Sequence, residues 1–291
     1  MTMNEEVDAV DVAAVVGANL GSRPVEVTEL DGGEVGRVRR VELADGRTAV
    51  LKTGETPLSV EASMLRYLAD ETDLPVPAVY AATDEFLLLE YVAGEDDAAV
   101  TPAVERDLAA HLASLHDVTA ERFGFPFDTL SGPLTQRNPW TDSWVEFYRD
   151  QRLMPVADEA RESGRLGLTD YERVGSLAAD LPDLIDEPES PSLVHGDVWR
   201  GNLVLDGERI AAFLDPAVYY GHHEVELAYV DWTGVGGETF FEAYRRHRGV
   251  ATGFFETRRD VYALYPVLEH VWYFGRSYHD DLDRLLSRLG Y

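Results

Sequence analysis

The sequence predicts an α+β fold of two lobes, a small N-terminal lobe built on an antiparallel sheet and a larger, mostly helical C-terminal lobe. Residues 24–51 alternate short strand patterns with turns rich in Gly and Asp. From residue 102 onward, the apolar residues recur mainly at helical spacing. With 291 residues the chain can build two cores, so we expect the lobes to span residues 1–93 and 94–291.

The small lobe is predicted to contain two helices and five strands. In chain order these are a helix over 1–20, three strands within 24–51, a helix over 57–70, and strands at 79–82 and 86–92. Gly21 is expected to end the first helix. The second is expected to begin with Thr56 as N-cap and Pro57 at the first helical position, the places these residue types favour.

The large lobe is predicted to contain helices and one short hairpin. The helices are expected at 102–118, 140–153, 169–181, 227–232, 240–248, 258–274 and 278–289. Asp206-Gly207 is a strong turn signal between two short apolar runs, so we expect a hairpin there. Glu224 and Glu226 precede the helix at 227, where acidic residues favour the helix dipole, and we interpret Glu226 in this way.

Polar residues at fixed spacing surround this hairpin and indicate phosphoryl transfer. Asn202 follows Asp197 by five positions, and Asp215 follows beyond the hairpin. Kinases place a catalytic Asp, a metal-binding Asn and a metal-binding Asp in this order. An ordinary polar hairpin is the alternative, but three residues at matching spacing favour a protein-kinase-like fold. We therefore predict Asp197 as the base that meets the acceptor hydroxyl, and Asn202 and Asp215 as Mg²⁺ ligands.

The composition draws attention to Lys52. Among 25 basic residues, Lys52 is the only lysine. It follows a predicted strand at 48–51, and a compact ammonium suits a tight phosphate site better than a broad guanidinium. We predict that Lys52 binds the α- and β-phosphates of ATP and pairs with Glu61 of the following helix. A lysine retained by chance on the surface is the alternative.

Two further segments of the small lobe lie where a kinase binds its nucleotide. The turn at 31–36 precedes the Lys52 strand, but it reads GGxxG rather than GxGxxG, so a plain hairpin turn is equally consistent. Backbone groups in the segment FLLLEYVAG are expected to bind adenine. The residues concerned are Gly32, Gly33 and Gly36 for the phosphates, and Glu90, Tyr91 and Val92 for adenine.

The segments HGDVWRGN and LDPAVYYGHHEVELA resemble the fructosamine kinase (ketosamine-3-kinase) family, within the wider aminoglycoside phosphotransferase and choline kinase group. The resemblance extends from about residue 25 to the end. It implies phosphorylation of a sugar hydroxyl of a ketosamine, in protein deglycation, with Trp199, Tyr220 and His222 on the acceptor side. An aminoglycoside or amino-alcohol phosphotransferase and a nucleotide-binding pseudokinase scaffold remain alternatives.

The net charge of −29 limits the possible partners. Such a surface repels nucleic acid and anionic membranes, and the scattered acidic residues are typical of a halophilic protein. The N-terminus lacks the basic start of a signal peptide, and no apolar run could cross a bilayer, so we expect a soluble, cytoplasmic protein. The absence of cysteine excludes disulfides and thiolate metal sites.

Overall fold

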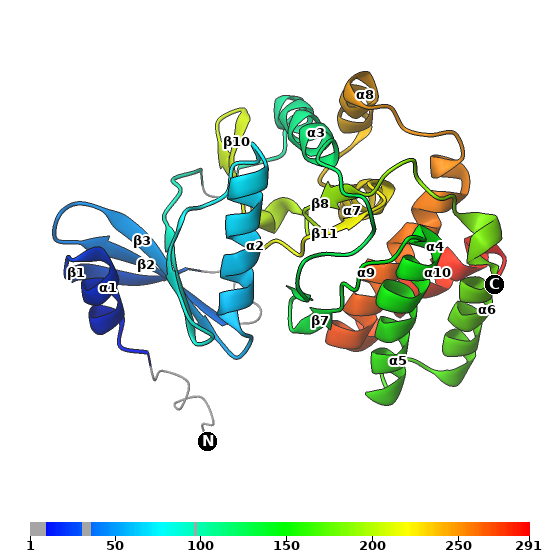
Figure 1. Cartoon of the computed structure of the whole chain (residues 1–291), viewed down its shortest axis with the longest axis horizontal. Coiled ribbons are helices and arrows are strands. Elements are labelled where there is room, and N and C mark those ends of the chain that lie inside the picture. The colour runs from blue at the N-terminus through cyan, green and yellow to red at the C-terminus, as the bar shows by residue number, and fades with distance from the viewer. Residues whose placement is uncertain (1–9, 31–35, 96–97) are drawn as a thin grey trace. The chain divides into compact units, whose positions relative to one another are not determined.

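The computed structural model describes residues 10–30, 36–95 and 98–291, which divide into two compact units (Figure 1). Unit 1 comprises the described residues of Met1–Ala99, together with Thr129–Thr135 and Gly201–Ala217. Unit 2 comprises Val100–Asp128, Gln136–Arg200 and Val218–Tyr291. Segments distant in sequence therefore pack with the N-terminal part of the chain, whereas the lobe boundary after residue 93 stays a prediction.

Unit 1 is built on a five-stranded antiparallel sheet with the strand order β1-β2-β3-β5-β4. The strands are β1 (Pro24–Leu30), β2 (Gly36–Leu43), β3 (Thr48–Gly54), β4 (Val79–Ala82) and β5 (Phe86–Glu90). The central strand is β3, in which Lys52 pairs with Val38 of β2 and with Leu87 of β5. The antiparallel sheet predicted from the sequence is therefore present.

Two helices, α1 (Val12–Leu20) and α2 (Leu58–Glu71), cover opposite faces of this sheet. On one face, Val16 of α1 packs into a cluster that contains Leu88 of β5. On the other face, Leu65 of α2 packs against Leu87 and Leu89. Successive residues of a strand point to opposite faces, so β5 contributes to both clusters.

The ends of these helices test the capping predictions. Gly21 ends α1 in the left-handed conformation, with φ of 67°, as expected for a C-cap glycine. The prediction for α2 was wrong by one residue, because Pro57 and not Thr56 occupies the N-cap position and no side chain caps this end. The fixed φ of proline is compatible with either position, so the sequence could not separate them.

A hairpin from the second half of the chain belongs to unit 1. It consists of β9 (Leu203–Asp206) and β10 (Arg209–Phe213). The amide of Glu95 donates to the carbonyl of Leu205 at 2.7 Å. The amide of Phe213 donates to the carbonyl of Pro75 at 2.8 Å. A side chain at Gly94 would collide with the β9 backbone, so glycine is required for this close approach. A second small hairpin pairs β6 (Thr129–Ser131) with β7 (Leu134–Gln136).

Unit 2 is mostly helical. Its helices are α3 (Pro102–His116), α4 (Trp144–Tyr148), α5 (Met154–Glu162), α6 (Leu168–Leu184), α7 (Glu224–Thr233), α8 (Glu238–His247), α9 (Arg259–Phe274) and α10 (His279–Leu289). The central helix is α9, which contacts α5, α7 and α10 and is buried from Val261 to Leu268 (Figure 1). A short antiparallel pair, β8 (Ser192–Val194) with β11 (Tyr219–Gly221), completes the unit.

One π-helical segment lies within a predicted helix, and another lies at the start of a second predicted helix. The helix predicted at 140–153 is α4 followed by a π-helical segment, Arg149–Leu153, and the helix predicted at 258–274 is preceded by another, Phe254–Arg258. A shift of hydrogen bonds from i−4 to i−5 leaves little trace in apolar spacing, so the sequence did not reveal them. Within the described ranges, no helix is long and apolar enough to span a membrane.

Candidate active site

Lys52 points to the face of the sheet that α2 covers. Side chains alternate along β3, and Lys52 shares a face with Val50, which packs against the α2 cluster. As a result, Nζ of Lys52 lies 2.8 Å from Oε1 of Glu61 on α2. Nζ also contacts Oδ1 of Asp215, which follows β10. The predicted ion pair between Lys52 and Glu61 is therefore present, and Asp215 joins it.

The electrostatics of this cluster depend on its burial. The side chains of Lys52 and Glu61 are each 15% exposed. Burial acts to lower the pKa of Lys52, but the charges of Asp215 and Glu61 outweigh it and raise that pKa above its usual value. Burial raises the pKa of Glu61 to about 7, where Lys52 opposes the shift and Asp215 adds to it. One ammonium between two carboxylates leaves a site that favours a further cation.

Asn202 and Asp215 lie at the two ends of the β9–β10 hairpin. The amide of Leu214 donates to the carbonyl of Asn202 at 2.9 Å, which ties these ends together. Among the described residues, Asp215 is the only non-glycine residue with positive φ, at 52°. Such strained backbone is typical of functional sites. Asn202 is 5% exposed, and the side chain of Asp215 is 45% exposed.

The donor chemistry of Asn202 and Asp215 fits Mg²⁺. The ion prefers oxygen ligands, and proteins often hold it with one or two side chains while substrate phosphates supply further oxygens. Within the described part of the chain, no group of three or more His, Cys, Asp and Glu side chains could hold a metal ion without such help. These two residues would therefore hold Mg²⁺ together with a nucleotide.

The predicted nucleotide-binding backbone is described only in part. Gly32 and Gly33 lie outside the described residues. Gly36 begins β2, and a side chain there would collide with the carbonyl of Thr53 in β3, so its glycine has a packing reason. Its contact with phosphates stays a prediction.

Part of the backbone in the predicted adenine-binding segment is already hydrogen-bonded to a neighbouring segment. The amide of Glu90 donates to the carbonyl of Ala78 at 2.8 Å, so this amide is not open to adenine. The ring of Tyr91 lies 4.9 Å from the guanidinium carbon of Arg40. Adenine recognition by the remaining backbone groups of Glu90, Tyr91 and Val92 stays a prediction.

Unit 2 contains Asp197, in the loop that follows β8. The hydroxyl of Tyr229 on α7 donates to Oδ1 of Asp197 at 2.6 Å. The amide of Asp197 lies 3.3 Å from Nδ1 of His195, and the His195 side chain is fully buried. His195 therefore supports the conformation of the loop from within.

Glu226 holds the same loop from α7 and was missed as a site residue. It lies in the first turn of α7, because the helix begins at Glu224 and not at the predicted residue 227. Its carboxylate is buried and accepts from the amides of Gly196, at 2.7 Å, and His195, at 3.3 Å. His116 lies 2.8 Å away through Nε2. Burial acts to raise the pKa of Glu226, but the hydrogen bond with His116 and the nearby positive charge outweigh it and lower that pKa. The interpretation as a simple helix-end residue was therefore incomplete.

The three residues predicted to face the acceptor have different environments in unit 2. Trp199 is 41% exposed. Tyr220 is buried, with its ring 6.1 Å from that of Phe125. His222 is also buried, and burial, together with the charge of Arg258, lowers its pKa to about 3. Of these three side chains only that of Trp199 is exposed, and contact with the acceptor stays a prediction for all three.

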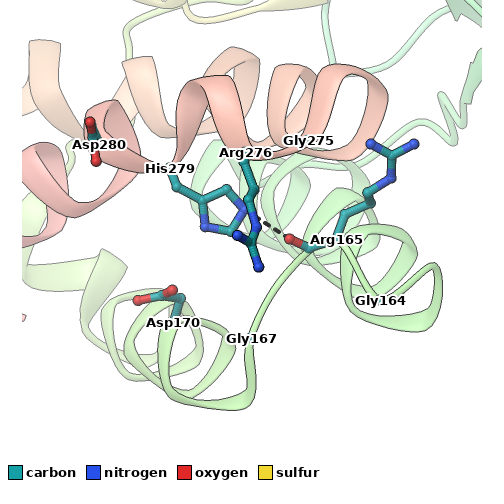
Figure 2. A pocket seen from close by; sticks show the side chains of 8 residues that line it. All are labelled: Gly164, Arg165, Gly167, Asp170, Gly275, Arg276, His279 and Asp280. Atoms are coloured by element: carbon teal, nitrogen blue, oxygen red, sulfur yellow. Dashed lines mark hydrogen bonds between the residues drawn. The ribbon is translucent and has the colours of Figure 1, made fainter.

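Unit 2 also contains a pocket that is lined by none of the predicted site residues (Figure 2). It has a volume of about 720 Å³ between the start of α6 and the start of α10. Arg165 and Arg276 line it together with Asp170 and Asp280, so its charges are mixed. None of the residues predicted for nucleotide, metal or acceptor lines this pocket.

Comparison with known proteins finds sequence relatives that are named as kinases of fructosamines, ketoamines or ketosamines. The sequence profile of fructosamine kinases matches residues 11–290. An Enterococcus faecium protein assigned as a ketoamine kinase is 30% identical over 270 residues, which cover 90% of this chain and 94% of the relative. The mouse ketosamine-3-kinase is 38% identical over 172 residues, which cover 58% of this chain and 54% of the relative.

Solved structures agree with these relatives. The crystal structure of a Thermobifida fusca protein assigned as a fructosamine-3-kinase superposes with a TM-score of 0.85 at 30% identity and covers 96% of this chain and 98% of that one. An aminoglycoside phosphotransferase in complex with ADP and hygromycin B gives a TM-score of 0.69 at 18% identity, over 96% of this chain and 97% of that one, which shows a shared fold. This chain has the kinase-like fold of these phosphotransferases, and it belongs to the fructosamine kinase family.

Proposed function

We propose that this protein transfers the γ-phosphoryl group of ATP to a sugar hydroxyl of a ketosamine, in the removal of sugar adducts from proteins. Membership of the fructosamine kinase family supports the acceptor class. The observation that carries the phosphoryl chemistry is the contact of Lys52 with both Glu61 and Asp215 in unit 1. A lysine oriented by one carboxylate, beside a metal-binding carboxylate, is the arrangement that phosphoryl transfer from ATP requires.

In this proposal Lys52 binds the α- and β-phosphates, and Glu61 keeps its ammonium in place. Asn202 and Asp215 hold Mg²⁺, which when bound neutralises charge on the phosphate oxygens. Asp197 accepts or orients the proton of the acceptor hydroxyl as the oxygen attacks the γ-phosphorus atom. The bond from that phosphorus to the bridging oxygen breaks, and ADP leaves with the electron pair.

Trp199 is our candidate for contact with the acceptor. Trp199 is 41% exposed and lies two residues after Asp197. An indole face can pack against sugar carbons and against the ammonium of a ketosamine. The strongly acidic chain would also attract a cationic amine, although this attraction does not separate ketosamines from aminoglycosides.

The net charge of −29 supports a halophilic protein that works in a salt-rich cytoplasm. Self-repulsion among so many carboxylates weakens the compact state in dilute buffer, and concentrated counterions screen it. The same charge disfavours nucleic acid and anionic membranes as partners.

The proposal is tested by measuring phosphate transfer from ATP in high salt to ribulosamine, fructosamine and aminoglycoside acceptors. We expect transfer to a ketosamine that depends on Mg²⁺ and falls by at least about 100-fold in Asp197→Asn, while ATP still binds. Preferential transfer to an aminoglycoside would replace the proposed acceptor class. ATP binding without transfer to any acceptor would indicate a scaffold.

A further inference from the structure

We propose that Tyr229 is a positioning residue for phosphoryl transfer, whose hydroxyl fixes the carboxylate of Asp197 in its working orientation. The inference rests on the proposed function, because it concerns the base identified there. Oη of Tyr229 donates to Oδ1 of Asp197 at 2.6 Å. Both residues belong to unit 2, so the bond is part of that unit's own structure.

Tyr229 lies on the helix, α7, that also holds the backbone of the loop carrying Asp197. Glu226 and Tyr229 are three residues apart, so they lie on the same face of the helix. Glu226 accepts from the amides of His195 and Gly196, and Tyr229 donates to the side chain of the next residue, Asp197. Two side chains on one face of α7 therefore hold the loop. The Glu226 carboxylate binds its backbone, and the Tyr229 hydroxyl binds the side chain of Asp197.

The ring of Tyr229 is held by contacts that do not involve its hydroxyl. Its centroid lies 5.9 Å from that of Trp232. Trp232 in turn meets His270 edge-on, with centroids 4.8 Å apart, and lies 6.1 Å from Tyr278. Removal of the hydroxyl alone should therefore leave the ring in place, which makes its contribution to Asp197 measurable by itself.

The chemistry of the pair explains what the hydroxyl does. Burial, and then the negative charge of Asp197, raise the pKa of Tyr229 well above its ordinary value, so the phenol remains a proton donor. The nearby Glu269 and Tyr278 also raise this pKa. A neutral donor bound to a carboxylate stabilises its ionised form and restricts its rotation. Both effects keep Asp197 ready for the acceptor hydroxyl.

The test is Tyr229→Phe, assayed for phosphate transfer from ATP to a ketosamine. We expect kcat to fall by about 10- to 100-fold, the scale of a hydrogen bond to a charged group, with KM for ATP unchanged. The acid limb of the kcat/KM profile should move to higher pH, because the Asp197 carboxylate loses a donor that favours its ionised form. A purely structural role would lower the melting temperature without moving the profile.

The matched control is Tyr171→Phe. Tyr171 donates to Asp158 at 2.7 Å in an exposed pair of the same chemistry, and we expect this variant to keep both kcat and the pH profile. Equal kcat and an unmoved acid limb in Tyr229→Phe, with wild-type protein active on a ketosamine, would overturn the inference.

A second measurement does not need activity. The ¹³C resonance of the Asp197 carboxyl group can be identified by its loss in Asp197→Asn and then titrated in wild type and in Tyr229→Phe. We expect a higher titration midpoint in the variant, and an equal midpoint would overturn the inference. If wild-type protein phosphorylates no ketosamine, the proposed function fails, and the titration still decides the role of Tyr229.

Discussion

His116 and Glu226 form a buried pair in unit 2, with Nε2 of His116 lying 2.8 Å from Oε2 of Glu226, although 110 positions separate them in the chain. The other ring nitrogen of His116 lies 2.7 Å from the hydroxyl of Tyr244 on α8. The Glu226 carboxylate also accepts from the amide of Gly196, next to Asp197. Side chains of α3, α7 and α8 are thus joined beneath the loop that carries the proposed base.

Glu226→Gln should lower the free energy of unfolding by about 3 kcal/mol at pH 7, because it removes a buried carboxylate that accepts hydrogen bonds from the amides of His195 and Gly196. The folded-state pKa of Glu226 lies below its ordinary value of 4.5. The stabilisation is therefore fully present above pH 4.5 and is lost as the pH falls through the folded-state pKa. Denaturant unfolding at several pH values should show that the difference between wild type and variant narrows below pH 4.5.

The control for this substitution is Glu172→Gln, on the exposed side of α6. It should change the free energy of unfolding by less than about 0.5 kcal/mol. A constant difference between wild type and Glu226→Gln from pH 7 down to pH 3 would show that the charge of Glu226 contributes no stability.

Asp215→Asn should remove most of the Mg²⁺ dependence of nucleotide binding. Asparagine keeps the shape and tolerates the positive φ of 52° at this position, so the backbone strain is unchanged. The substitution removes the charge that attracts the ion and that contacts Lys52. Calorimetric titration with ATP, with and without Mg²⁺, should give nearly equal affinities for the variant. A Mg²⁺ effect as large as that of wild type would exclude Asp215 as the metal ligand.

Spacing within short segments of the sequence was enough to predict much of the fold and the contacts among the candidate site residues of unit 1. Lys52 follows a regular strand pattern, and Glu61 lies in the first turn of the next helix, so local periodicity predicts their meeting. Asn202 and Asp215 flank one hairpin, where a turn signal fixes the geometry.

The contacts that the sequence did not reveal join distant segments. His116 lies on a helix with ordinary apolar spacing, and nothing in its neighbourhood points to Glu226. Tyr229 resembles any aromatic residue of a core helix until its hydroxyl is placed beside Asp197. Tyr220 and His222 are the converse case, because the motif that suggests an acceptor-side role for them does not reveal the tertiary packing that buries their side chains.

The stability of the protein should rise with salt. With a net charge of −29, screening weakens repulsion between carboxylates as the Debye length falls from roughly 10 Å at 0.1 M to roughly 3 Å at 1 M. Calorimetric melting in KCl between these concentrations should show an increasing Tm. An uncharged osmolyte at equal osmolality is the control, since it cannot screen charge. A Tm that is flat in KCl, or that rises equally in the osmolyte, would contradict the halophilic prediction.

Lys52→Arg is the substitution that tests the nucleotide site most directly. Arginine keeps the positive charge between Glu61 and Asp215, so the Tm should change little. Its planar, forked group is broader than an ammonium and cannot reproduce a point contact with phosphate while it is paired with both carboxylates. We therefore expect kcat/KM for ATP to fall by about 100-fold, the scale of a misplaced catalytic contact, measured in high salt with saturating acceptor.

The reverse exchange at an exposed ion pair, Arg284→Lys beside Asp281, is the control and should leave kinetics and Tm unchanged. The contrast matters because every other basic residue of this chain is arginine. If Lys52 only balanced the charges of Glu61 and Asp215, Arg would balance them equally well and the substitution would be silent. Wild-type kinetics for Lys52→Arg would therefore show that Lys52 does not bind the nucleotide. A large fall in kcat/KM with an unchanged Tm would leave phosphate binding as the reason for the lysine.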